Sequence, residues 1–82
     1  MNSIQCRMAR AALGLGVREL AAAAKVSPDT VARLERGEDL RERTIVDIRQ
    51  ALEAAGVVFL ADGETVDGGP GVRLAKPKRG KK

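Results

Sequence analysis

The apolar residues of this chain follow two different periods. Up to about residue 56 they recur every three or four positions, the spacing of helices that bury one face. At Val57-Val58-Phe59-Leu60 four apolar residues stand in succession, which favours a short β-strand because β-branched and aromatic side chains suit extended backbone. We therefore expect a mainly α-helical domain with a small β element at its C-terminal end.

The first helix is expected to begin at a polar cap near the N-terminus. Asn2 or Ser3 can cap it, and Gln5 follows Asn2 at the spacing of a capping box. Gly14 is expected to end it. Its apolar face is expected to comprise Ile4, Met8, Ala12 and Leu15, with Leu13 beside them.

Two short helices joined by a tight turn are expected next. The first covers residues 17–24, with a narrow apolar face at Leu20, Ala21 and Ala24 that lets a neighbouring helix approach closely. The second has Ser27 as its cap, Pro28 at its first position and Gly37 as its stop. Val31 and Leu34 are expected to face the core. The opposite side, short and polar, comprises Asp29, Ala32, Arg33 and Arg36.

A charged loop, residues 38–43, precedes the expected fourth helix. Thr44 and Asp47 have the spacing of a capping box that opens this helix, and Gly56 is a natural terminator. The expected apolar stripe is Ile45, Ile48, Leu52 and Ala55. After the strand at 57–60 and a loop rich in Asp and Gly, Val72-Arg73-Leu74 forms a second short strand that closes a loose hairpin.

Charge is unevenly distributed along the chain. The 82 residues carry a formal net charge of +4, but residues 1–75 hold 10 Lys and Arg against 11 Asp and Glu. The remaining five positive charges lie in KPKRGKK, residues 76–82. We expect one domain over residues 1–75, with a β element at 57–75, and a disordered basic tail at 76–82. The tail either grips DNA without sequence preference or only keeps the protein soluble.

Several function classes are poorly supported by the composition. One cysteine, Cys6, and no histidine exclude an intrachain disulfide and argue against a zinc site, so we expect no metal and no cofactor. No hydroxyl has an obvious base, so we expect no enzyme.

The chain contains no apolar run that would indicate a membrane span or a signal peptide. The single aromatic residue, Phe59, argues against base-stacking single-strand binders, which leaves duplex DNA. The alanine- and arginine-rich composition suggests a bacterial or phage source. The single unpaired cysteine fits a reducing cytosol, so we expect a cytoplasmic location, at the nucleoid.

Residues 15–37, LGVRELAAAAKVSPDTVARLERG, resemble the helix-turn-helix of Cro/C1-type (XRE family) transcriptional regulators. The resemblance extends over roughly residues 4–56 and rests on Leu15, Glu19-Leu20-Ala21, Ala24, Val26-Ser27, Val31, Leu34-Glu35 and Gly37. In this family an arginine late in the first helix pairs with the glutamate that Glu35 matches. The resemblance therefore implies an Arg10–Glu35 ion pair, as a partly buried carboxylate requires a cationic partner.

The chain departs from the family pattern at three places. Gly16 and Val17 stand where the family usually has a small polar cap and a phosphate-binding glutamine. We expect the neighbouring Arg18 to supply a substitute phosphate contact. Lys25 replaces the usual turn glycine, at a backbone position that often needs positive φ, and its amine can reach a phosphate. A strand at Val57 takes the place of the usual fifth helix.

The resemblance implies that the third helix lies in the major groove of DNA. Arg33 stands where the family contacts bases, and arginine can donate two hydrogen bonds to guanine; the alternative is a solvated arginine paired with Asp29. Asp29 either accepts from cytosine or only stabilises the helix start. The other candidate base contacts are Pro28 and Ala32. The candidate phosphate contacts are Arg18, Lys25, Thr30, Arg36, Arg41 and Arg43, for several of which a merely solvated surface is the alternative.

Both faces of the strand at 57–60 are apolar. We expect Val57 and Phe59 to cover the helices while Val58 and Leu60 meet a second subunit, as part of a dimer interface that also holds Val72 and Leu74. The alternative is that the hairpin and its loop cover both faces within one monomer.

Together these features predict a sequence-specific double-stranded DNA-binding transcriptional regulator, which binds a two-fold symmetric operator as a homodimer through the helix at 28–36. The alternative is a protein-interaction module, of antiactivator or antitoxin-like type, on a helix-turn-helix scaffold that no longer binds DNA. Val17 and the nearly neutral body favour that alternative.

Overall fold

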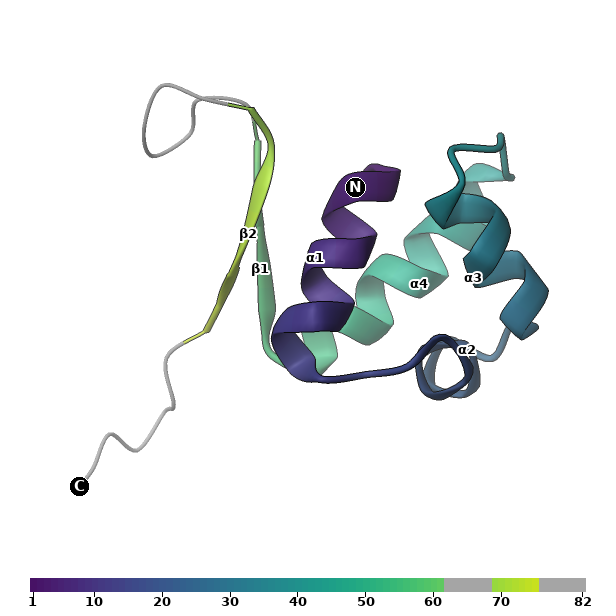
Figure 1. Ribbon diagram of the computed structural model, residues 1–82, viewed down its shortest axis with the longest axis horizontal. Coiled ribbons are helices and arrows are strands. Elements are labelled where there is room, and N and C mark those ends of the chain that lie inside the picture. Colours follow the sequence, from purple (N-terminus) through teal and green to yellow (C-terminus); the bar gives the residue numbers. More distant parts are fainter. Residues whose placement is uncertain (62–68, 76–82) are drawn as a thin grey trace.

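A computed structural model of the chain describes residues 1–61 and 69–75, and in these ranges four helices precede a two-stranded antiparallel sheet (Figure 1). The elements are α1 (Ser3–Leu13), α2 (Val17–Ala24), α3 (Pro28–Glu35), α4 (Glu42–Ala54), β1 (Val57–Leu60) and β2 (Gly71–Leu74). The expected mainly α-helical fold with a C-terminal hairpin is therefore confirmed. The tail expected at 76–82 and residues 62–68 of the Asp- and Gly-rich loop lie outside the described residues.

The capping of α1 agrees with the sequence, but its buried face does not. The Asn2 side chain accepts from the Gln5 N–H at 2.8 Å, and the Gln5 side chain accepts from the Asn2 N–H at 3.0 Å. The expected apolar face is wrong at Ile4, which is 62% exposed, and at the exposed Ala12, whereas Leu13 does pack against the core. The buried residues of α1 are instead Gln5, Cys6 and Ala9. Small side chains on this face allow α1 to pack closely against both α3 and the hairpin.

Helix α4 begins earlier than the capping-box pattern predicts. Its N-cap is Arg41, whose backbone carbonyl accepts from the N–H groups of Thr44 and Ile45. Thr44 and Asp47 thus lie inside the helix, and Asp47 lies 3.7 Å from Arg43 in an i,i+4 ion pair. The expected start was wrong because backbone hydrogen bonds began the helix without a side-chain cap. Ala55, expected in the apolar stripe, is the exposed C-cap residue.

The core lies where the four helices and β1 meet. Its largest fully buried side chains are Cys6, Leu20, Val31, Ile48 and Leu52. Ala9, Ala21 and Ala24 are also buried, and such small residues let the helices approach closely. The core therefore draws on every helix, which fixes the two helices of the 15–37 segment relative to each other.

The hairpin lies against α1, on the side away from α3 (Figure 1). Val57 pairs with Leu74 and Phe59 with Val72, so these four side chains share one face of the sheet. Val57 is buried, and Phe59 and Val72 pack against the core. The Gln5 Nε2 donates to the carbonyls of Leu60 and Gly71, both at 3.0 Å. One buried side chain of α1 thereby holds both strands.

Candidate nucleic-acid interface

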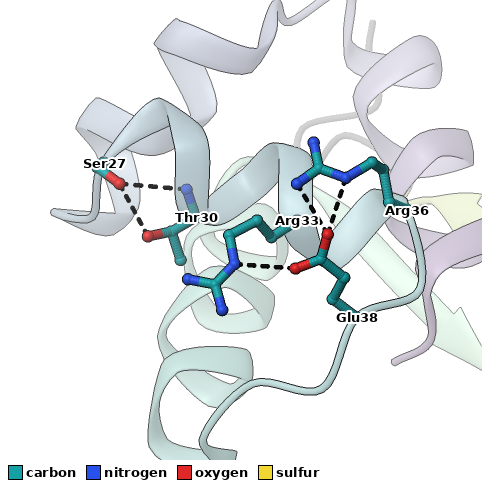
Figure 2. A network of polar contacts seen from close by, with 5 residues as sticks. All are labelled: Ser27, Thr30, Arg33, Arg36 and Glu38. Atoms are coloured by element: carbon teal, nitrogen blue, oxygen red, sulfur yellow. Dashed lines mark hydrogen bonds and ion pairs between the residues drawn. The ribbon is translucent and has the colours of Figure 1, made fainter.

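Helix α3 is fixed at its start by a local cap. The Ser27 hydroxyl accepts from the Thr30 N–H at 3.1 Å and shares a 2.8 Å hydrogen bond with the Thr30 hydroxyl (Figure 2). Pro28 occupies the first turn, and Asp29 adds a negative charge near the positive end of the helix. The expected start of this helix is confirmed.

The buried side of α3 is tied to α1 by a bidentate ion pair. The Arg10 Nε and Nη2 donate to the two Glu35 oxygens, both at 2.8 Å, and Arg10 Nη1 donates to the Leu15 carbonyl at 3.1 Å. The Cys6 thiol donates to Glu35 Oε2 at 3.3 Å. The Arg10 hydrogen bonds, together with that from Cys6, hold the pKa of Glu35 below its usual value despite burial. This network sets how α3 is rotated about its axis, and so which residues it exposes.

The exposed side of α3 carries the candidate base contacts. Pro28 and Asp29 are exposed, and Ala32 and Arg33 are partly exposed. Because these residues lie three or four positions apart, the structure brings them together on one helical face. We call Pro28, Asp29, Ala32, Arg33 and Arg36 the outer face of α3.

The two arginines of the outer face share one carboxylate. Arg33 Nε donates to Glu38 Oε1 at 3.1 Å, and Arg36 donates to Glu38 Oε2 through Nε at 2.9 Å, with Nη2 at 2.8 Å (Figure 2). The partner of Arg33 is thus Glu38 and not Asp29. The hydrogen bonds from Arg36 and then Arg33 lower the pKa of Glu38. The sequence alone did not single out Glu38, because it lies in a loop of mixed charge. The indication it did offer was the position of Glu38 directly after Gly37, the glycine that ends the third helix.

The residues at the start of α2 differ from those usual in the Cro/C1-type family. Gly16 is the N-cap, and its N–H donates to the Glu19 carboxylate at 2.6 Å. Val17 is partly buried and packs against the core, which accounts for an apolar residue where the family has glutamine. The neighbouring Arg18 is exposed. Lys25 is also exposed and adopts φ +61°, the left-handed backbone expected at the turn.

A hollow of about 540 Å³ lies between α3 and the start of α4. It is lined by Thr30, Arg33, Asp39, Leu40, Arg41 and Thr44. No side chain caps the first turn of α4, whose N–H groups are a favourable environment for an anion. Arg43 in that turn is 86% exposed. The structure therefore places Arg41 in the same hollow as Thr30 and Arg33 of α3, and Arg43 in the first turn of α4, paired with Asp47. Arg18 and Lys25 belong to α2 and the turn after it.

Other kinds of site find little support in the part of the chain that the structure describes. No group of three or more His, Cys, Asp or Glu residues there could hold a metal ion. No helix within residues 1–61 and 69–75 is long and apolar enough to cross a membrane.

Helix α2, the turn at Lys25 and helix α3 form a helix-turn-helix. Helix α3 buries one side against α1 and α2 and exposes a short polar side. The model of the family described as "Helix-turn-helix domain" matches residues 4–61. The chain belongs to this family, whose fold is a DNA-binding one and generally not enzymatic. Among curated proteins, no sequence matches the chain significantly.

Proposed function

We propose that this protein, from a bacterium or a phage, is a sequence-specific transcriptional regulator of the Cro/C1 type. It binds duplex DNA in the bacterial cytoplasm, at the nucleoid. The observation that carries the proposal is the division of α3 into two sides. Its inner side is locked to α1 by Arg10 and Glu35, while its outer face presents Arg33 and Arg36. A short exposed helix held in this way has the geometry of a helix that enters the major groove.

The proposed base contacts are Pro28, Asp29, Ala32 and Arg33. Arg33 is the main one, because a guanidinium can donate two hydrogen bonds to guanine O6 and N7. Ala32 and Pro28 offer apolar contact to a thymine methyl group, and Asp29 is an acceptor for a cytosine amino group. The proposed phosphate contacts are Arg18, Lys25, Thr30, Arg36, Arg41 and Arg43, which lie at or near the ends of α2, α3 and α4.

We further propose that the protein is a homodimer that pairs through the hairpin. Val58 is 42% exposed and Leu74 49% exposed, and Leu60 is partly exposed. Val57, Phe59 and Val72 pack within the monomer. The interface we propose therefore narrows to Val58 and Leu60 on the outer face of the sheet, while Leu74, which lies on the same face as Val57, contributes only at the end of the hairpin. A two-fold dimer would contact two half-sites about 34 Å apart, or a multiple of that distance.

A second candidate function rests on the same apolar residues. Val58, Leu74 and the 62% exposed Ile4 offer apolar contact to a different protein, as in an antiactivator or an antitoxin-like module. Val17 no longer favours this alternative, because it packs against the protein's own core.

The experiment that tests the proposal is selection of binding sites from a pool of random duplexes at about 0.1 M salt, followed by sequencing. Enrichment of a two-fold symmetric motif supports the dimeric regulator and gives the half-site spacing. Enrichment of an asymmetric single site retains the regulator but contradicts the dimer. Binding without enrichment contradicts sequence specificity. Absence of binding contradicts the regulator and favours the protein-interaction alternative.

A further inference from the structure

Glu38 lies next to the proposed DNA-binding groups because of the way α3 ends. Gly37 adopts φ +87°, and the Glu38 N–H then donates to the Arg33 carbonyl at 3.0 Å. This left-handed turn, which glycine adopts without strain, folds the chain back over the last turn of α3. The Glu38 side chain is thereby aimed at the outer face of α3 by backbone hydrogen bonds.

The single carboxylate engages its two arginines unequally. Arg36 uses both Nε and Nη2 on Oε2, whereas Arg33 uses Nε alone on Oε1. Figure 2 shows the two terminal nitrogens of Arg33 directed away from Glu38. Within residues 1–61 and 69–75 these terminal nitrogens make no hydrogen bond, because the bond to Glu38 uses Nε. Arg33 is therefore oriented by one edge of its guanidinium and free at the other.

We propose that Glu38 is a specificity-determining residue of the DNA-binding face, which lowers affinity for non-cognate DNA more than for the cognate site. The inference rests on the proposed function. On a cognate site, the terminal nitrogens of Arg33 donate to a guanine edge while Nε stays on Glu38. Phosphates of any duplex compete with Glu38 for Arg36, but only on the cognate site does Glu38 also orient Arg33 toward a base, which offsets part of that loss.

Two physical effects act in the same direction. Phosphate contacts supply affinity that is independent of sequence, and a carboxylate that neutralises arginines removes part of it. Glu38 is 44% exposed, so its remaining charge would add to this first effect by repelling phosphates that approach this face. Restricting Arg33 to one orientation lowers the entropy lost when it contacts a base. Suppressing the wrong complex is a recognised way of increasing specificity.

The test compares the wild type with Glu38→Gln on the duplex enriched by selection and on a scrambled duplex, across a range of salt concentrations. The matched control is Glu53→Gln. Glu53 pairs with Arg49 at 2.9 Å on α4, at a similar exposure of 41%, and its replacement removes the same charge at a place away from α3.

We expect Glu38→Gln to bind the scrambled duplex about five- to tenfold more tightly near 0.1 M salt, with a salt slope steeper by about 0.9 from one added phosphate contact. Its affinity for the enriched duplex should change less, so the specificity ratio falls. Glu53→Gln should keep the wild-type ratio and slope. The NMR signals of the Arg33 and Arg36 Nε–H groups should move in Glu38→Gln alone, while melting temperatures stay close to that of the wild type.

Three other outcomes overturn the inference. If Glu38→Gln leaves both affinities, and so the specificity ratio, as in the wild type, Glu38 does not determine specificity although the protein binds DNA. If it loses affinity for both duplexes equally, Glu38 only supports the fold or the general DNA contact. If the wild type enriches no sequence, the proposed function itself fails and this inference fails with it; the first two outcomes occur only when the wild type does enrich one.

Discussion

Arg10 and Glu35 join α1 to α3 through two parallel hydrogen bonds, each 2.8 Å long. Glu35 is only 8% exposed and Arg10 23%, so most of this pair is removed from water. Breaking this pair should destabilise the protein more than breaking the exposed ion pairs on α4, because it would leave a desolvated carboxylate without a partner.

Arg10→Met should therefore destabilise the protein by about 2 to 3 kcal/mol, since the apolar stem is kept while Glu35 is left without its main donor. Urea unfolding followed by circular dichroism measures this free energy. Glu53→Gln, which disrupts the exposed Arg49–Glu53 pair, is the control and should cost at most about 0.5 kcal/mol. A cost for Arg10→Met no larger than the control's would contradict the role assigned to this pair.

The same pair predicts how stability depends on pH. The pKa of Glu35 is lower in the folded protein than in the unfolded chain, chiefly because of the hydrogen bonds from Arg10. The stabilisation it provides is thus complete at pH values above the pKa of Glu35 in the unfolded chain, and it is lost as pH falls through the lower pKa of the folded protein. Unfolding free energies at several pH values below 5 should fall less steeply in Glu35→Gln than in the wild type. Parallel curves would show that Glu35 does not contribute to acid unfolding.

The lone thiol should be inert in the folded protein. Burial raises the pKa of Cys6 to about 12, and the neighbouring Glu35 carboxylate adds to this effect. Because the thiolate is the nucleophile, Cys6 should react with a thiol reagent at pH 8 only as fast as the protein unfolds. The rate should rise by orders of magnitude in denaturant. Rapid labelling of the native protein would indicate that this part of α1 opens locally.

The hairpin should depend on Gln5. Gln5→Ala removes both hydrogen bonds to the Leu60 and Gly71 carbonyls, as well as half of the capping box, and should cost about 2 kcal/mol. Amide hydrogen exchange of the strand residues should accelerate more than that of α3. Asn2→Ala is the matched control, because it weakens the cap but leaves the bonds to the hairpin intact. Equal exchange rates in the two variants would exclude a role for Gln5 in holding the strands.

Specific DNA binding should depend on Arg33. Arg33→Ala should weaken binding to the enriched duplex by about 1 to 3 kcal/mol and relax the preference at one base pair. Arg43→Ala, a proposed phosphate contact, should instead weaken all duplexes alike and reduce the salt slope by about 0.9. Selection experiments with both variants distinguish the two roles. An unchanged motif for Arg33→Ala would remove Arg33 from the base contacts.

Several features of this protein followed from the sequence alone because they depend on residues only a few positions apart. The cap at Ser27, the capping box of Asn2 and Gln5, and the strand at 57–60 are all of this kind. Each brings its partners together once the local backbone is helical or extended, whatever the rest of the chain does.

Other features were decided only by the tertiary structure. Which side of α1 is buried depended on the small residues needed where α3 and the hairpin approach it, so Cys6 and Ala9 lie inside while Ile4 is exposed. The pairing of Glu38 with Arg33 and Arg36 depended on the backbone turn at the end of α3 and on the rotation of that helix set by the buried ion pair. Sequence spacing cannot predict such contacts, because they depend on how packed elements are oriented relative to one another.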